Sequence, residues 1–159
     1  MMENVVVGIA EGKIARNGQV LVSYALGSCV GVCLYDRRGS TAGMVHIILP
    51  TKSSAVQQAN PYKFADEGIR ALIDEMVKAG VPRIRLAAKI AGGAKMFSTD
   101  NIRWEIGQQN VEAVKRTLAE ERIPVTAEDT GKNYGRTIYF YVDESKLEVR
   151  TVRHKVVVL

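Results

Sequence analysis

Residues 26–35 read Leu-Gly-Ser-Cys-Val-Gly-Val-Cys-Leu-Tyr, and residues 42–49 read Ala-Gly-Met-Val-His-Ile-Ile-Leu. Each stretch is apolar and rich in β-branched residues, which favours a β-strand, and the polar segment 36–41 between them is typical of a turn. The first strand begins with Cys29 directly after a Gly-Ser turn, and the second carries His46 near its middle. A thiol becomes a good nucleophile when a base removes its proton, and histidine is the usual base. We therefore expect Cys29 and His46 to form a catalytic pair.

The pairing register of these two strands decides whether the two side chains can meet. If Tyr35 lies opposite Ala42 across the turn, His46 lies opposite Gly31. Because side chains alternate along a strand, Cys29 then points to the same face as Gly31 and becomes the diagonal neighbour of His46. Gly31 would leave room for the imidazole ring. A register shifted by one residue would send His46 to the other face and remove this support.

Each of these residues also has a purely structural explanation. Free cysteines are often small buried hydrophobes, and Cys33, in the middle of the first strand, fits that role. Histidine in an apolar strand is usually structural as well, and we expect His154, in the basic C-terminal segment, to lie on the surface without a partner. The spacing of Cys29, Cys33 and His46 fits no standard zinc site, so we expect no metal. A strand segment of this length spans about 13 Å, which is too far for a Cys29–Cys33 disulfide.

The rest of the chain shows both helix and strand patterns. Apolar residues at helical spacing, with Asn60-Pro61 as a start and Gly80 as a stop, predict one helix. A second helix is predicted over 107–121, with a buried stripe that includes Val111, Val114, Leu118 and Ala119.

Several further segments alternate apolar and polar residues and predict strands. The Asn17-Gly18 pair favours a hairpin between 13–15 and 20–24. The other predicted strands cover residues 5–9, 84–90, 125–128, 137–142 and 147–152. The strands 137–142 and 147–152 are expected to form a hairpin. The fold class that follows is α+β with a mixed, largely antiparallel sheet system.

Length and composition bound the function classes. With 159 residues and no apolar run of about 18 residues, the chain is expected to form one domain, residues 1–159, without membrane insertion. The N-terminus lacks a signal-peptide pattern, and two cysteines in such a chain favour the cytoplasm. The net charge is +5 at pH 7, but Lys and Arg are scattered beside Asp and Glu. We therefore expect a solvated surface and no nucleic acid, although the charge would suit an acidic protein partner.

A glycine-rich segment, Gly92-Gly93-Ala94, follows the predicted strand 84–90. The full nucleotide-binding fingerprints are absent, so a tight turn that shapes a pocket rim is favoured over a phosphate loop. The apolar pair Met96-Phe97 beside it lies either in the core or at that rim, where it could contact a partner.

Six short blocks of sequence occur in a fixed order. They are Leu-Gly-Ser-Cys-Val (26–30), Met-Val-His-Ile-Ile-Leu-Pro (44–50), Tyr-Lys-Phe-Ala-Asp (62–66), Lys-Ile-Ala-Gly-Gly-Ala-Lys-Met-Phe (89–97), Ile-Gly-Gln-Gln-Asn (106–110) and Glu-Asp-Thr-Gly (128–131). Together they resemble the chemoreceptor glutamine deamidases, the CheD family of bacterial and archaeal chemotaxis. The resemblance extends over roughly residues 5–150.

The resemblance implies a fold like the catalytic domain of cytotoxic necrotising factor toxins, with packed β-sheets flanked by helices. It implies a cysteine-dependent protein-glutamine glutaminase, without cofactor, that converts glutamine side chains of methyl-accepting chemotaxis receptors to glutamate. Receptor methylesterase activity is an alternative. A second alternative is a non-catalytic regulatory module that binds a CheC-type phosphatase.

The resemblance also assigns roles to residues. It implies Cys29 as the nucleophile and His46 as the base. The third catalytic position of the family is usually threonine and falls on Ser23, which keeps the hydroxyl group. Residues 129–132 read Asp-Thr-Gly-Lys where the family usually has two glycines, so this loop is expected to differ in shape.

Overall fold

The structure is a computed structural model that describes residues 2–51, 60–96 and 105–159. In these residues the strands form two sheets of five strands each. In spatial order, sheet A contains β1 (Glu3–Val6), β3 (Gln19–Leu26), β8 (Arg136–Tyr141), β9 (Lys146–Arg150) and β10 (Val157–Val158). Sheet B contains β2 (Gly12–Arg16), β5 (Thr41–Ile47), β4 (Val30–Asp36), β6 (Leu86–Gly92) and β7 (Val125–Thr130).

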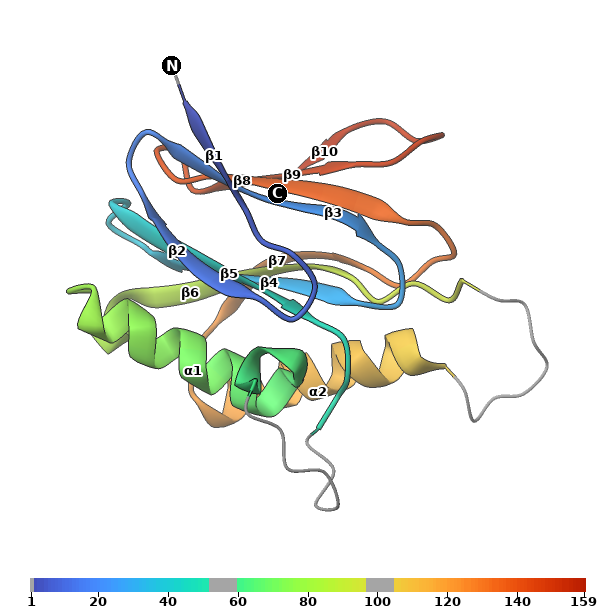
Figure 1. Ribbon diagram of the computed structural model, residues 1–159, viewed down its shortest axis with the longest axis horizontal. Helices are drawn as coiled ribbons and strands as arrows, with labels where there is room; N and C mark the ends of the chain where they lie inside the picture. The colour runs from blue at the N-terminus through green and yellow to red at the C-terminus, as the bar shows by residue number, and fades with distance from the viewer. Residues whose placement is uncertain (1, 52–59, 97–104) are drawn as a thin grey trace.

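The strand directions agree with the predicted fold class. Neighbouring strands are antiparallel except for β1 with β3 and β6 with β7, which run parallel. Two α-helices, α1 (Ala65–Lys78) and α2 (Ile106–Glu120), cover one face of sheet B, and sheet A covers the other face (Figure 1). The expectation of mixed, largely antiparallel sheets flanked by helices is therefore confirmed.

Helix α1 buries the apolar stripe that its sequence predicts. In α1 the buried residues recur every three or four positions, which places them on one side of the helix. They are Ala65, Gly68, Ile69, Leu72, Ile73 and Met76. The predicted start at Asn60 is a short 3₁₀ turn, Pro61–Lys63, in which the Asn60 side chain accepts a hydrogen bond from the Tyr62 N–H at 3.1 Å. The α-helix itself begins at Ala65.

Strand β4 runs through the centre of sheet B, between β5 and β6, and is buried along its whole length. Its side chains alternate between two apolar cores. Val30, Val32 and Leu34 pack toward the helices, whereas Cys33 and Tyr35 pack toward sheet A. Side chains of this strand can therefore meet solvent only near its ends.

The prediction of a hairpin around Asn17-Gly18 is wrong. The turn exists, with a φ of 86° at Gly18, but the strands that it joins belong to different sheets. Strand β2 pairs with β5, and β3 pairs with β1 and β8. A turn motif predicts that the chain reverses, and it cannot distinguish strands that pair side by side from strands that pack face to face.

Two smaller predictions differ from the structure, and one strand has no prediction. The strand predicted over 84–90 begins at Leu86, because residues Arg83–Arg85 form a 3₁₀ turn in which Ile84 is 82% exposed. Ala119 lies on the exposed side of α2 rather than in its buried stripe. Strand β10 was not predicted, since two valines are too short a segment to show alternation.

Candidate active site

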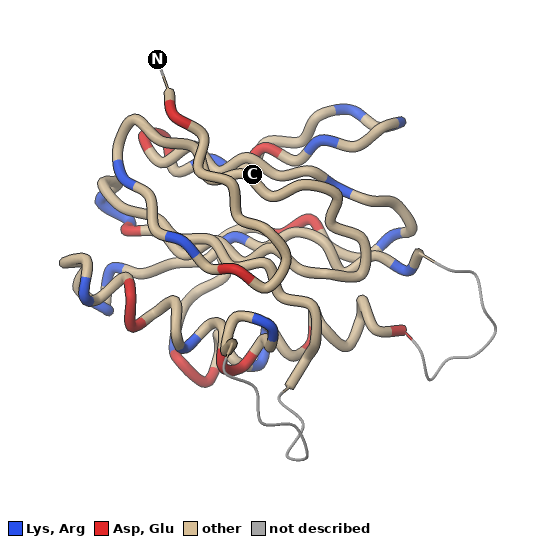
Figure 2. The backbone as a smooth tube through the Cα atoms, viewed as in Figure 1, with Lys and Arg blue, Asp and Glu red and all other residues tan. Residues whose placement is uncertain are grey.

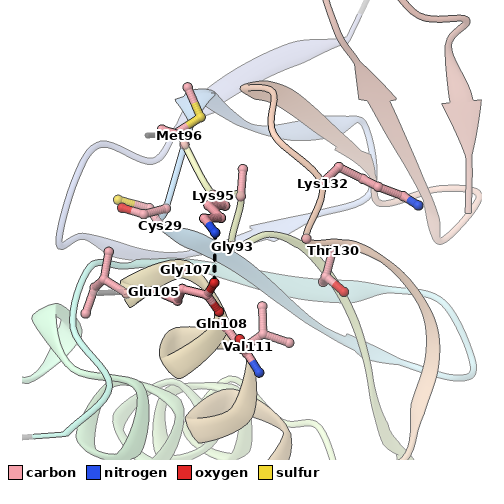
Figure 3. Close-up of a pocket in the computed structure, with 15 residues that line it drawn as sticks. Cys29, Gly93, Lys95, Met96, Glu105, Gly107, Gln108, Val111, Thr130 and Lys132 are labelled. Atoms are coloured by element: carbon pink, nitrogen blue, oxygen red, sulfur yellow. Dashed lines mark hydrogen bonds and ion pairs between the residues drawn. The ribbon is translucent and has the colours of Figure 1, made fainter. Parts of the chain in front are cut away.

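Cys29 lies in the turn between β3 and β4, directly before β4 begins. Its partly exposed side chain lines a cavity of about 930 Å³. The cavity walls come from residues 27–29, 93–96, 105–108, 111 and 130–132. Figure 3 shows Cys29 and Met96 at one side of this cavity, Thr130 and Lys132 at the other, and the Lys95–Glu105 ion pair between them. The candidate nucleophile is thus accessible from the cavity.

The predicted register of β4 and β5 is confirmed. Tyr35 lies opposite Ala42, and Gly31 lies opposite His46. His46 is 3% exposed and shares the face of β5 that is directed at sheet A. Cys29 packs against the core on that same side. The structure therefore puts Cys29, one residue before β4, on the same side of sheet B as His46.

The expected role of Gly31 is corrected by the structure. The atoms nearest to a Cβ added at Gly31 belong to Ile138 and Leu26, and the Ile138 methyl group would collide with it. Both residues come from sheet A. The missing side chain therefore lets the two sheets approach each other, and the space is not taken by the imidazole ring.

Ser23, on β3 of sheet A, reaches across the space between the sheets to His46. The Ser23 Oγ is 2.8 Å from His46 Nδ1 and 2.9 Å from the carbonyl oxygen of Val7. A carbonyl oxygen only accepts hydrogen bonds, so the single hydroxyl hydrogen is donated to Val7. His46 Nδ1 must then carry a hydrogen and donate it to Ser23. All three groups are buried, which keeps the imidazole in one orientation.

The electrostatics of His46 favour a neutral ring that can accept a proton. Burial lowers the pKa of His46, because the charged imidazolium loses solvation. With the hydrogen on Nδ1, the Nε2 atom of the neutral ring carries a lone pair. This Nε2 is buried and has no hydrogen-bond partner in the described part of the chain. It is therefore free to act as a base.

The surroundings of Cys29 favour the protonated form of its thiol. Burial raises the pKa of Cys29, and a hydrogen bond from its own backbone N–H opposes that effect in part. The backbone N–H groups of Ser28 and Cys29 make no hydrogen bond to another residue in the described segments. They are thus available to a negative charge that develops beside the sulfur.

The glycine-rich turn at residues 92–94 forms hydrogen bonds to the backbone around Cys29. The N–H of Gly93 donates to the carbonyl oxygen of Cys29 at 2.8 Å, and the N–H of Ala94 donates to that of Gly27 at 2.9 Å. At Gly92 the φ is 114°, and a Cβ would collide with the Cys29 carbonyl oxygen. The prediction that this segment shapes a pocket rim is confirmed, since Gly93 and Ala94 line the cavity.

Two buried polar residues near the cavity were missed as site residues. Asn110 on α2 is fully buried and donates to the Ser28 carbonyl oxygen at 3.0 Å. Its spacing from Gly107 and Val114 could have placed it on the buried side of the helix. Arg136 is 1% exposed, and alternation with Ile138 could have revealed this.

Arg136 holds the loop of residues 129–132 in place. Its guanidinium group forms an ion pair with Asp129 at 3.1 Å and donates to the Gly131 carbonyl oxygen at 3.0 Å. It also lies 4.7 Å from the centre of the Tyr134 ring. These contacts hold residues 130–132, which form one wall of the cavity.

The other residues that the sequence singled out have defined positions in the structure, except Phe97. Both cysteines are free, and Cys33 is fully buried, as predicted. His154 is exposed as predicted but does have a contact, since its ring centre lies 4.2 Å from that of Tyr134. Met96 is 46% exposed at the cavity wall and does not lie in the core, and Phe97 lies outside the described residues.

Figure 2 shows Lys and Arg residues scattered along the described backbone among Asp and Glu residues, in agreement with the sequence. In residues 2–51, 60–96 and 105–159, no group of three or more His, Cys, Asp or Glu side chains could hold a metal ion. None of the described helices is long and apolar enough to cross a bilayer.

Residues 48–151, more than half of the chain, match the family described as CheD chemotactic sensory transduction. A relative from Caldanaerobacter subterraneus is 47% identical over 152 residues, which are 94% of each chain. The chain belongs to the CheD family. This CheD chain is also 43% identical to a relative from Lachnoclostridium phytofermentans, over 96% of each chain. A third relative, from Pyrococcus horikoshii, is 42% identical over 95% of this chain and 94% of its own. All three bear the name "probable chemoreceptor glutamine deamidase CheD".

The CheD fold is also similar to a solved structure with a very different sequence. A Neisseria meningitidis protein of the DUF152 family superposes with a TM-score of 0.52 at 11% identity. The superposition covers 82% of this chain and 64% of that protein. At this identity the likeness shows a shared fold alone.

Proposed function

We propose that this CheD chain hydrolyses glutamine side chains of methyl-accepting chemotaxis receptors to glutamate, with Cys29, His46 and Ser23 as its catalytic machinery. The observation that carries the proposal is the arrangement around Cys29. Its thiol lines an open cavity, and the neighbouring buried imidazole has an unoccupied Nε2 and is held at Nδ1 by Ser23. The name of the three relatives supports the same activity.

In the proposed reaction the Cys29 thiol gives its proton to His46 Nε2 while the sulfur attacks the carboxamide carbon of glutamine. The carbonyl oxygen becomes negatively charged, and the free N–H groups of Ser28 and Cys29 stabilise it. His46 then gives the proton to the amide nitrogen, and the carbon–nitrogen bond breaks. Ammonia leaves, and a thioester between Cys29 and the former glutamine side chain remains.

Water completes the reaction with the same base. His46 Nε2 takes a proton from a water molecule, whose oxygen attacks the thioester carbon. The carbon–sulfur bond breaks, Cys29 regains a proton and the receptor side chain is released as glutamate. A methyl ester of glutamate would follow the same route with methanol as the leaving group. Receptor methylesterase activity is therefore the nearest alternative.

The shifted pKa values decide how the proton moves. The raised pKa of Cys29 and the lowered pKa of His46 favour a neutral thiol beside a neutral imidazole. The proposed resting state is therefore a neutral pair rather than a thiolate–imidazolium pair. The thiol is deprotonated during the attack itself, which requires that the sulfur, Nε2 and the substrate carbon be well aligned.

The experiment that tests the function is mass spectrometry of cognate receptors incubated with the purified chain. Wild-type protein should convert specific glutamines to glutamate, with release of ammonia. Cys29→Ala should abolish both signals while the protein stays folded. Cys33→Ala, which removes the other thiol, is the matched control and should remain active. Residual activity of Cys29→Ala near that of wild type would sink the assignment.

We also propose a CheC-type phosphatase as a second partner and the cytoplasm as the location, both on the resemblance of the sequence. The half-exposed Met96 at the cavity wall is a suitable apolar contact for such a partner. Met96→Asp should weaken phosphatase binding, whereas Cys29→Ala should still bind and stimulate the phosphatase. Equal binding by wild type and Met96→Asp would exclude this contact.

A further inference from the structure

The ladder between β4 and β5 stops directly beside the candidate nucleophile. Its last pair is Val30 with Ile47. The backbone of His46 is directed at the other neighbour of β5, because its N–H donates to Glu11 and its carbonyl oxygen accepts from Ala10. Since backbone groups alternate in direction along an antiparallel strand, Ile47 is directed at β4. The next hydrogen-bonded pair of this ladder would join residues 28 and 49.

That next pair does not form, and both of its members have other partners. The Leu49 N–H donates to the Lys63 carbonyl oxygen at 3.1 Å. The Ser28 carbonyl oxygen accepts from Asn110 Nδ2 at 3.0 Å. The same Nδ2 donates to the carbonyl oxygen of Ile48 at 3.1 Å. The amide group of Asn110 thus lies between the segment before β4 and the segment after β5, at the point where the two strands separate.

The hydrogen-bonding pattern determines which end of the Asn110 amide faces the strands. Two carbonyl oxygens can only accept, so the NH₂ group must face them with both of its hydrogens. The Oδ1 atom is buried and has no partner in the described part of the chain. An apolar side chain would avoid this buried, unpaired oxygen but could not hold the two carbonyl groups.

We propose that Asn110 is a positioning residue that sets the geometry of Cys29 relative to His46. Ser28 directly precedes Cys29, and Ile48 follows His46 by two positions. One amide group therefore holds the backbone next to Cys29 and the backbone next to His46. The proposal rests on the function proposed above for this site.

The Ser28–Cys29 peptide explains how Asn110 acts on the nucleophile. In a trans peptide the C=O and the following N–H point in opposite directions. When Asn110 holds the Ser28 carbonyl oxygen on the interior side, the N–H of Cys29 is directed away from it. That N–H interacts with the Cys29 thiol and is one of the donors available to the oxyanion. Loss of the Asn110 contact lets this peptide rotate and misaligns both the sulfur and the donor.

The test uses Asn110→Leu, which keeps the volume but removes both donors, and Asn110→Asp, which keeps the shape. Either variant is expected to lower kcat about tenfold to a hundredfold with KM little changed, because misalignment acts on the reacting atoms and Asn110 does not line the cavity. The pH at which iodoacetamide alkylation of Cys29 is half-maximal should move upward. Thr117→Val, a substitution at another buried polar position of α2, is the control and should leave both readouts at wild-type values.

Alkylation of Cys29 needs no receptor, so it separates the two proposals. If wild-type protein releases no ammonia from receptors, the proposed function fails, and the alkylation profiles of the variants still decide the role of Asn110. The positioning role is overturned if Asn110→Leu or Asn110→Asp lowers the melting temperature while the alkylation profile and the kcat of the folded protein stay at wild-type values. If one variant does not fold, the other decides by the same criteria.

Discussion

Cys29 and Cys33 belong to the same stretch of chain and point to the same side of sheet B, yet their surroundings differ in exposure and in neighbouring groups. Cys33 is fully buried between the sheets, and burial raises its pKa far above the ordinary range. Cys29 lines a cavity, receives a hydrogen bond from its own N–H and packs on the same side of sheet B as His46. Position along the strand, and not residue type, decides which thiol can react.

The largest expected effect is the difference in alkylation between the two thiols of the native protein. Cys33 can react only when the space between the sheets opens, which costs much of the global stability. Its alkylation by iodoacetamide should therefore be slower than that of Cys29 by at least about 10⁴-fold. Peptide mapping by mass spectrometry after timed labelling measures both rates. Similar rates would mean that the two environments do not differ as described.

Removal of the base should have the next largest effect. In His46→Gln, Cys29 keeps its place on the cavity but loses the group that takes its proton, so kcat should fall by about a thousandfold. Ammonia release from receptor glutamines measures this, with circular dichroism as the check of folding. A His46→Gln variant with near wild-type turnover would show that another group, or none, activates Cys29.

Ser23 should contribute less, because it acts on the ring and not on the substrate. Ser23→Ala removes one hydrogen bond of the buried ring, so kcat is expected to fall about tenfold. Ser23→Thr keeps the hydroxyl group and should retain most of the activity. If Ser23→Ala and Ser23→Thr behave alike in the ammonia assay, the hydroxyl group has no part in orienting His46.

The pH dependence should follow His46. The proposed mechanism needs the neutral ring, and burial lowers the pKa of His46 below the ordinary value of about 6.5. The acid limb of kcat/KM should therefore lie below pH 6.5.

The same shift affects folding. Between the lowered folded pKa and the ordinary unfolded value, the unfolded chain binds more protons, so stability should fall as the pH drops through this window. Denaturant titrations at several pH values measure it, and His46→Gln should lack this component. In the activity measurements, an acid limb of kcat/KM above pH 6.5 would contradict the buried, neutral ring.

The smallest effect is expected at Cys33. Cys33→Ala removes one sulfur atom from the core and should lower the free energy of unfolding by about 1 kcal/mol. Turnover should be unchanged, because the cavity and His46 are not touched. Urea denaturation and the ammonia assay together test this, and a large loss of activity in a folded Cys33→Ala protein would end the contrast between the two thiols.

The sequence predicts the β4–β5 pair well for a physical reason. Both segments are largely apolar, which indicates buried strands, and the short connecting turn leaves few possible registers. The residues around the pair were harder to predict. Asn110 is a buried polar side chain whose partners are backbone carbonyl groups of distant segments, and buried Arg136 on sheet A also contacts the Gly92 carbonyl group on sheet B. Such contacts depend on where whole layers of the fold come together, and local patterns contain no information about that.

Ser23 illustrates the same limit from the other side. Local alternation places its side chain on the buried face of a strand. The wrongly predicted hairpin of residues 13–24 would have put this strand beside β2. Only its place in sheet A brings the hydroxyl group opposite His46. The resemblance to a family supplied the residue, and the packing of the two sheets supplied its contact.

The central place of β4 in sheet B has a consequence for how the protein fails when it is heated. Its neighbours on both sides must separate before its amide groups can exchange with solvent deuterium, so these amides should be among the slowest to exchange. Because Cys29 is attached to the end of this strand, thermal inactivation should coincide with global melting and not precede it. The chemistry would then persist for as long as the fold does.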